Sequence, residues 1–371
     1  MMKNFIRLFA PCLFLLLSGC QSTEVFSIDY AMPAQVSFPA GLRSVAVVNN
    51  MSDTPENRPL QSSDEKTDRQ EDNGEITHIT HFYQGDGTVA TESLAQAIAD
   101  ENYFDEVIIC DSALRAHDFF PRENLLSQEE VKRLVQELDV DFLIALENVQ
   151  IKAVRKIDFS PYYNMFIGTI DANVYPSVRI YLPNRQTPMA TLNGNDSIFW
   201  EKLGATYGSA NKQLLTDQEL VKEASQFAGI AAVKQLLPYW ETAHRILYTG
   251  GSANMRDAAI YVREENWEAA VGLWRQTYNA KRVSKKKKMR AAYNIALGYE
   301  MQDSISQALD WSLKAQALAY ETDKVESKLT QENVEAEDVP NYIITSYYVS
   351  ELQKREKAMN LLQMQMKRFE E

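Results

Sequence analysis

The sequence predicts an α+β protein, in which an N-terminal α/β domain with a β-hairpin extension is followed by a domain made only of helices. Two observations support this fold class. Short apolar segments rich in β-branched residues alternate with amphipathic helical segments up to about residue 150. From about residue 217 onward, apolar residues recur at helical spacing, and a pattern is repeated within this part.

The chain begins with a segment that is typical of an export signal. Lys3 and Arg7 accompany a run of ten apolar residues, Leu8 to Leu17, which covers about 15 Å as a helix and is too short to span a bilayer. The run ends in Leu17-Ser-Gly-Cys20, which resembles the bacterial lipobox, where the cysteine thiol receives a diacylglyceryl group. We therefore expect residues 1–19 to be a lipoprotein signal peptide and Cys20 to be lipidated. An ordinary secretory signal is the alternative.

Localisation follows from the same segment. Gln21 stands after the cysteine instead of Asp, which by analogy with enterobacterial sorting favours the outer membrane over retention at the inner membrane. We expect a lipid-anchored protein of the cell envelope, attached to the membrane by the lipid on Cys20. Whether it faces the periplasm or the outside is left open.

The predicted α/β domain spans residues 43–216. Residues 20–42 are polar, carry two prolines and are expected to form a tether. Residues 52–75 contain eight acidic and three basic residues and are predicted to be an acidic mobile loop. Ser127 and Glu130 have the spacing of a capping box. In order, the expected elements are strands at 43–49 and 76–83, a helix at 88–101, a strand at 104–110, a helix at 128–139 and a strand at 141–149.

Two long strands are expected at 172–182 and 189–200, joined by a turn at Pro183–Gln186. Residues 158–170 contain four aromatic residues and fit no element. The helical domain is predicted at 217–371, beginning with a helix at 217–237. A second helical piece is expected at 239–248, after Pro238.

An internal repeat lies in the helical domain. Small residues at 258 and 270 and a tyrosine at 261 recur 38 residues later as Ala296, Ala308 and Tyr299. Small residues let two antiparallel helices approach closely, and the pattern resembles the tetratricopeptide repeat (TPR). A generic bundle of helical hairpins is the alternative. In TPR proteins the first helices of the pairs line a concave groove, which here would present Arg290, Tyr293, Leu297 and Glu300 as candidates for binding a partner.

The charge balance limits the class of partner. The chain has 38 Lys and Arg against 51 Asp and Glu, which gives a formal net charge of −13. Such a surface repels phosphate backbones, so nucleic-acid binding is not expected. One segment stands out, because residues 281–290 hold seven basic residues in ten. It is either a solvated loop leading into a helix or a contact for anionic lipid headgroups or an acidic partner segment.

No pattern predicts catalysis, a metal site or a cofactor. His78-x-x-His81 places its two rings on opposite faces of a strand, which does not suit a shared metal. Gly85-Asp-Gly-Thr88 lacks the lysine of a P-loop and is better explained as a turn with a helix cap. Ser209-x-x-Lys212 matches a short motif of serine acylases, but its partner motifs are missing.

Several segments together resemble a family. These are Arg43 to Asn50, residues 91–110, Phe199-Trp-Glu201 with Gly204, Leu237-Pro-Tyr-Trp240 and Asn266-Trp-Glu-Ala-Ala270. They are similar to the DUF6340-type lipoproteins of Bacteroidales, and the resemblance covers most of the mature chain without implying an activity. The α/β part resembles, more loosely, the periplasmic domain of curli-secretion-type lipoproteins, but it lacks their long amphipathic barrel segments.

The function expected from the sequence is that of a non-enzymatic scaffold, which binds a protein partner in the envelope through the TPR-like repeats. A component of a secretion or export assembly is one alternative. A hydrolase that acts on envelope glycan through the strand-rich region 151–216 is another, because aromatic residues in strands can stack on sugars as well as pack against each other.

Overall fold

The computed structural model describes residues 23–52, 61–62, 77–110, 113–115, 125–329 and 335–369. They form two compact units, and the chain passes from one unit to the other at three points. The α/β unit contains Ala34–Tyr239 and the C-terminal residues from Met364, and the helical unit contains the residues up to Pro33 and Trp240–Gln363. The predicted fold class, α+β with a helical C-terminal region, is confirmed.

The centre of the α/β unit is a parallel sheet. Strand β2 (Ser44–Asn49) lies between β5 (Glu106–Cys110) and β6 (Phe142–Ser160), and it pairs in parallel with both. Side chains of β2 alternate between two helices on opposite faces: Val45 and Val47 pack with α2 (Gly87–Asp100), and Ala46 and Val48 pack with α3 (Gln128–Leu138). Burial on both faces explains why residues 45–48 of this strand are all apolar.

An antiparallel extension grows from this sheet. Strand β6 continues into a hairpin with β7 (Met165–Tyr181), and β7 also pairs with β8 (Ala190–Asn193) and β9 (Asp196–Gly204). On its other side β6 pairs with β4 (Thr77–Gln84), which pairs with the short β3 (Gln61–Ser62). The predicted extension is therefore present. The unassigned residues 158–170 form the end of β6, the connecting turn and the beginning of β7.

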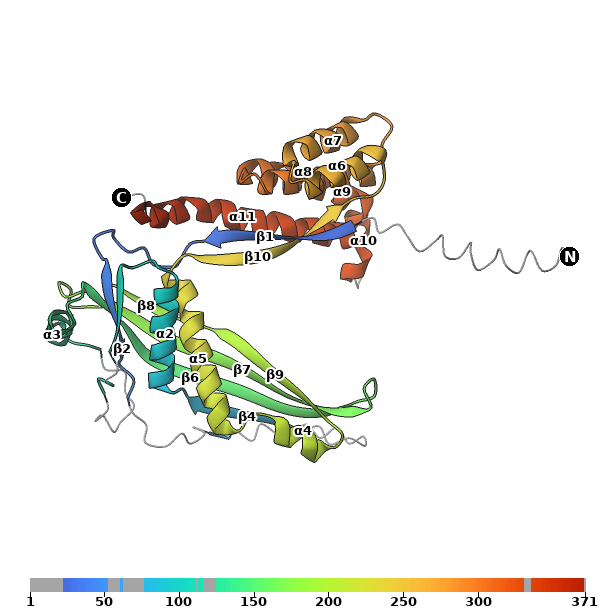
Figure 1. Cartoon of the computed structure of the whole chain (residues 1–371). Coiled ribbons are helices and arrows are strands. Elements are labelled where there is room, and N and C mark those ends of the chain that lie inside the picture. Colours follow the sequence, from blue (N-terminus) through green and yellow to red (C-terminus); the bar gives the residue numbers. More distant parts are fainter. Residues whose placement is uncertain are drawn as a thin grey trace. The chain divides into compact units, whose positions relative to one another are not determined.

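Helices α4 (Tyr207–Gln213) and α5 (Asp217–Leu236) complete the α/β unit. Helix α5 lies beside α2 on the same face of the sheet (Figure 1). The two helices touch at Gly229, where an added Cβ would lie 2.4 Å from the carbonyl oxygen of Ala90. The structure thus divides the chain elsewhere than at the predicted boundary of 216/217, because α5 packs on the sheet.

The C-terminal end of the chain also belongs to the α/β unit. The buried side chain of Gln365 accepts a hydrogen bond from the Ala34 N–H (2.9 Å) and donates to the carbonyl oxygens of Ala34 (3.1 Å) and Val36 (3.0 Å). Nearby, the Arg368 guanidinium stacks on Tyr103. Residues 34–42, predicted to lie in a tether, are thereby fixed to the unit.

In the helical unit, strands β1 (Thr23–Met32) and β10 (Tyr239–Tyr248) pair with each other. Both differ from the sequence prediction, which placed β1 in the tether and gave residues 239–248 to a helix. In β1 the inward side chains Ile28, Tyr30 and Met32 alternate with exposed ones. This period of two is the strand pattern, and the partner strand that completes it lies 207 residues along the chain from Met32 to Tyr239.

The remaining helices of the described residues form two pairs, one short helix and a long C-terminal helix. The pairs repeat at the predicted spacing of 38 residues: Ala270 and Ala308 are both buried, and Glu265 and Asp303 both turn the chain with positive φ, 59° and 53°. The helices are α6 (Ala253–Arg263), α7 (Trp267–Asn279), α8 (Lys285–Glu300), α9 (Ile305–Thr322), the short α10 (Val325–Lys328) and α11 (Pro340–Met366).

Candidate functional site

The four residues predicted to line a partner groove lie on α8, but three of them are inside the protein. Tyr293, Leu297 and Glu300 are buried. The Tyr293 ring packs against Tyr248 of β10 and Tyr348 of α11, at 5.4 and 4.7 Å between ring centres. The side of α8 that was expected to face a partner is therefore covered by strand β10 and helix α11 of the same chain.

Arg290, the fourth predicted residue, is half-buried. Its guanidinium lies over the Tyr248 ring, 5.2 Å from the centre. It therefore packs on β10 together with Tyr293, and the four residues do not form an open binding surface.

Glu300 is the centre of a buried ionic cluster. It accepts from Arg245 of β10 (3.0 and 3.1 Å), from Arg355 of α11 (2.6 Å) and from the Tyr348 hydroxyl (2.7 Å). Burial raises the pKa of Tyr348 well above its ordinary value, and the Glu300 carboxylate raises it further. Glu351 adds a second negative charge, 3.7 Å from Arg245. With both oxygens of Glu300 occupied, the cluster joins β10, α8 and α11 and leaves no group free for a ligand.

A second polar cluster lies at the carboxyl end of the parallel strands, where α/β proteins usually bind ligands. Glu147 is placed there by an irregularity in the β6–β7 pairing between Leu146 and Asn148. Its carboxylate accepts from the Tyr181 hydroxyl (2.8 Å) and the Asn50 amide (2.7 Å), and Arg179 lies 3.4 Å away. Burial raises the pKa of Glu147, although these partners oppose the shift. The carboxylate is held by partners on β7 and on the residue after β2, so its role is to stabilise the carboxyl ends of the paired strands.

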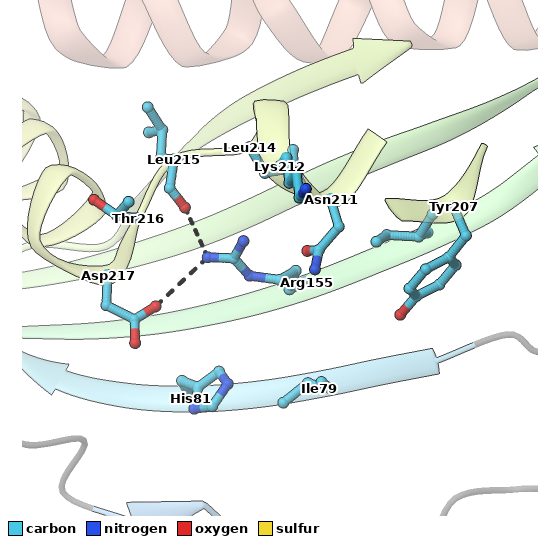
Figure 2. A pocket seen from close by; sticks show the side chains of 11 residues that line it. Ile79, His81, Arg155, Tyr207, Asn211, Lys212, Leu214, Leu215, Thr216 and Asp217 are labelled. Carbon is cyan, nitrogen blue, oxygen red and sulfur yellow. Dashed lines mark hydrogen bonds and ion pairs between the residues drawn. The ribbon is translucent and has the colours of Figure 1, made fainter. Parts of the chain in front are cut away.

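A cavity of about 420 Å³ opens between β4, β6 and α4 in the α/β unit (Figure 2). On its floor the Arg155 guanidinium donates to the carbonyl oxygen of Leu215 (2.8 Å) and lies 3.5 Å from the carboxylate of Asp217. His81 and Lys212 also line it. Arg155 is paired with Asp217, and Lys212 adds one further positive charge to the wall, so the cavity does not present a concentrated charge.

The short motifs weighed in the sequence have structural roles. Asp86 is the N-cap of α2 and accepts from the Val89 N–H (3.1 Å), which confirms the cap predicted at Gly85–Thr88. Ser209 is bound into the cap of α4, where its hydroxyl donates to the Thr206 carbonyl (2.8 Å), so it is not paired with Lys212 as a nucleophile. The capping box of Ser127 and Glu130 is present.

The histidine motif divides between the described and undescribed parts of the chain. His81 lines the cavity, whereas the side chain of His78 lies outside the described residues. Among the residues that the structure describes, no group of three or more His, Cys, Asp or Glu side chains is placed to hold a metal ion.

The tip of the β6–β7 hairpin carries the exposed aromatic residues that sequence reasoning left unassigned. Tyr162, Tyr163 and Phe159 are 87%, 56% and 49% exposed. The two tyrosine rings meet edge to face with 4.8 Å between centres, and Phe159 packs in the same way on Phe166 at 5.3 Å. Residues 159–170 contain no charged side chain. This uncharged, aromatic-rich run was the signal in the sequence; its first residues form an exposed tip, whereas Ile170 at its end is buried in the core.

The basic segment 281–290 forms the turn before α8 and the first turns of that helix. Lys281, Arg282, Lys286 and Lys287 are exposed, and Lys285 forms an ion pair with Glu321. The predicted signal peptide (residues 1–19), the lipidation site Cys20 and most of the predicted acidic loop 52–75 lie outside the described residues. Within the described part of the chain, no helix combines the length and apolar character needed to span a bilayer.

Comparison with known proteins identifies two families whose members resemble parts of the chain. No curated protein and no solved structure matches it. The family described as "Domain of unknown function (DUF6340)" matches residues 256–354, which agrees over this segment with the resemblance inferred from the sequence. The family described as "Domain of unknown function (DUF8603)" matches residues 42–248, which is more than half of the chain. The protein therefore belongs to the DUF8603 family and carries a DUF6340 segment C-terminal to that domain in the sequence.

Proposed function

We propose that this protein is a lipid-anchored, non-enzymatic binding protein of the cell envelope, and that a protein partner docks on the tip of the β6–β7 hairpin. The observation that carries the proposal is the exposure of Phe159, Tyr162 and Tyr163 on this tip. Tyrosine is enriched among the residues that dominate protein interfaces, because it combines a large apolar ring with a hydrogen-bonding hydroxyl. This site replaces the groove predicted on α8, where three of the four side chains are buried and Arg290 packs on β10.

The chemistry around the tip favours a protein over a charged ligand. Lys156 forms an ion pair with Asp158 beside the tip, so the base of this surface is electrically balanced. Residues 159–170 add no charge. An uncharged aromatic surface gains free energy mainly by desolvation against a complementary apolar surface, as protein partners provide.

The lipid anchor is the second part of the proposal. It is supported by Lys3, Arg7, the short apolar run and the lipobox-like sequence ending at Cys20. We also propose that the helix pairs α6–α7 and α8–α9 are of TPR type. The side of α8 that would line the TPR groove is covered by β10 and α11 of the same chain. The equivalent turns at Glu265 and Asp303 support this assignment.

Site-specific photo-crosslinking tests the proposal in cells. A photoreactive phenylalanine at position 162 should give a discrete crosslinked protein, whereas the same group at Asn184, in the exposed turn before β8, should not. The double change Tyr162→Ser and Tyr163→Ser should reduce copurification of that protein by at least about tenfold. Tyr347→Ser, which removes a tyrosine 63% exposed in the helical unit, is the matched control.

The same cells test the anchor independently. In membranes washed with about 1 M salt, which screens electrostatic attachment, Cys20→Ser should move the protein from the membrane fraction to the soluble fraction without changing its fold. If Tyr347→Ser lowers copurification as much as the double change, the hairpin tip is not the docking surface. A captured protein that belongs to an export machine would select the secretion alternative for the pathway.

A further inference from the structure

One surface of the helical unit combines cations with aromatic rings. The Arg275 guanidinium of α7 lies 5.6 Å from the ring centre of Tyr299 and 5.9 Å from that of Trp311. The Lys314 ammonium lies 4.1 Å from the Trp311 ring. Tyr278 packs edge to face on Trp311 with 5.0 Å between centres. Three helices, α7, α8 and α9, thus build one cation–aromatic face.

The basic turn before α8 extends this face. The Lys288 ammonium lies 5.8 Å from the ring centre of Tyr278, and Lys281, Arg282, Lys286 and Lys287 are exposed nearby in sequence. Residues 275–290 contain no Asp or Glu. The acidic groups on the facing helix α9 are Asp310 and Glu321, and Glu321 already pairs with Lys285. The face therefore keeps a strong positive charge on a chain whose net charge is −13.

We infer that this cation–aromatic face docks on the anionic headgroups of a lipid bilayer. Clustered lysines and arginines are attracted to an anionic membrane surface without needing a shaped site. Tyr and Trp rings beside cationic side chains are the composition that accumulates where protein meets the headgroup region. The exposed lysines are flexible, which suits a diffuse layer of charge better than a single bound anion.

The position of the proposed anchor favours the membrane over an acidic protein segment. Cys20 stands three residues before Thr23, where β1 begins, and β1 belongs to the helical unit. Three residues span at most about 10 Å, so lipidation would hold this unit next to the bilayer. This choice of occupant rests on the anchor proposed above, whereas the cation–aromatic face does not depend on it.

Vesicle flotation with the whole mature chain carrying Cys20→Ser tests the inference without any contribution from acyl chains. The protein should float with vesicles of phosphatidylcholine and phosphatidylglycerol, and not with vesicles of phosphatidylcholine alone. Salt at about 1 M, where the Debye length is about 3 Å, should release it. The fourfold change K281Q, R282Q, K286Q and K287Q should weaken binding by at least about tenfold.

A matched variant controls for net charge. K132Q, K222Q, K234Q and K357Q remove four exposed lysines elsewhere and should leave flotation unchanged. Equal losses in the two variants, or no flotation of the parent chain with anionic vesicles, would overturn the inference. Tight binding of a free polyglutamate peptide without flotation would also overturn it and identify an acidic protein segment as the occupant. Because Cys20→Ser is present throughout, none of these outcomes depends on whether lipidation occurs.

Discussion

At the scale of single residues, the main finding is that Glu300 is an interior charge. Its carboxylate pairs with two buried guanidinium groups, those of Arg245 and Arg355, which come from elements distant in sequence, and Glu351 supplies the second negative charge. Burying an ionised group is costly unless it is paired and hydrogen-bonded, and here every partner is present. The cluster therefore makes the packing of β10, α8 and α11 specific to one arrangement.

Removing the negative charge of Glu300 should destabilise the protein strongly, although glutamate and glutamine side chains are nearly equal in size. Glu300→Gln leaves two buried arginines with the single counter-charge of Glu351, and we expect it to lower the free energy of unfolding by about 3 kcal/mol or more. Glu351→Gln, at the partly exposed edge of the cluster, should cost less than about 1 kcal/mol. Urea denaturation of both variants measures the difference, and equal midpoints would refute the interior role of Glu300.

The residue scale also shows what sequence could and could not tell about the site. Helical spacing correctly places Arg290, Tyr293, Leu297 and Glu300 along one helix, but which side of that helix meets water depends on β10 and α11. Those elements come from other parts of the chain, and burial cannot be derived from local spacing. The same holds for Glu147, because the irregular pairing that turns it inward is visible only in the paired strands.

At the scale of elements, local patterns predicted those whose periodicity is strong. The alternation at 43–110, the capping box at Ser127 and Glu130 and the 38-residue repeat all appear where expected. Strands β1 and β10 were missed because their sequences are only half apolar and their pairing is non-local. The hairpin tip was missed because exposed aromatic residues resemble core residues when read one segment at a time.

Helix α8 differs from α3 and α5 at its first turn. Those two helices have a capping box in which Glu130 or Glu219 occupies the third position after the N-cap. After its N-cap Ser284, α8 has Lys287 in this position, inside a run of four lysines at the positive end of the helix. Lysines in the first turn destabilise the helix, because they lie at the positive end of its dipole. The positive charge of this turn therefore does not serve helix stability.

Lys287→Glu should therefore make the protein more stable. The new carboxylate completes a capping box with Ser284 and removes a cation from the positive end of the helix, for a gain of about 1 kcal/mol. Lys357→Glu, in the middle of α11, changes the charge equally without either effect. Thermal unfolding should show a higher Tm for Lys287→Glu than for Lys357→Glu. An unchanged or lower value would show that the first turn of α8 is held by other contacts.

At the scale of the whole molecule, the α/β unit depends on the last residues of the chain. Gln365 closes hydrogen bonds with the backbone of Ala34 and Val36, and α5 adds one more, which the Gln35 N–H donates to the carbonyl oxygen of Gln235 (3.0 Å). Arg368 adds a hydrogen bond to the carbonyl oxygen of Leu42 (3.0 Å). Residues 34–42 and the C-terminal segment from Met364 thus meet in one unit.

Gln365→Ala should loosen the α/β unit although the residue lies on the C-terminal helix. It leaves one buried N–H and two buried carbonyl groups without their partner, at a cost of about 2–3 kcal/mol. Hydrogen exchange of residues 34–42 should accelerate. Gln363→Ala removes an exposed glutamine from the same helix and should change nothing. Similar exchange in the two variants would mean that the C-terminal segment does not secure residues 34–42.

The three crossings between units also determine where the protein can be cut. The DUF8603 match at 42–248 includes β10, which belongs almost entirely to the helical unit, and it excludes Gln365. The DUF6340 match at 256–354 lacks β1, β10 and Arg355. Neither segment is a self-sufficient folding module, since each leaves behind strands or side chains that its own unit requires. The two parts therefore have to be expressed together as a single chain, because β1 and β10, which pair with each other, stand on either side of the α/β unit in the sequence.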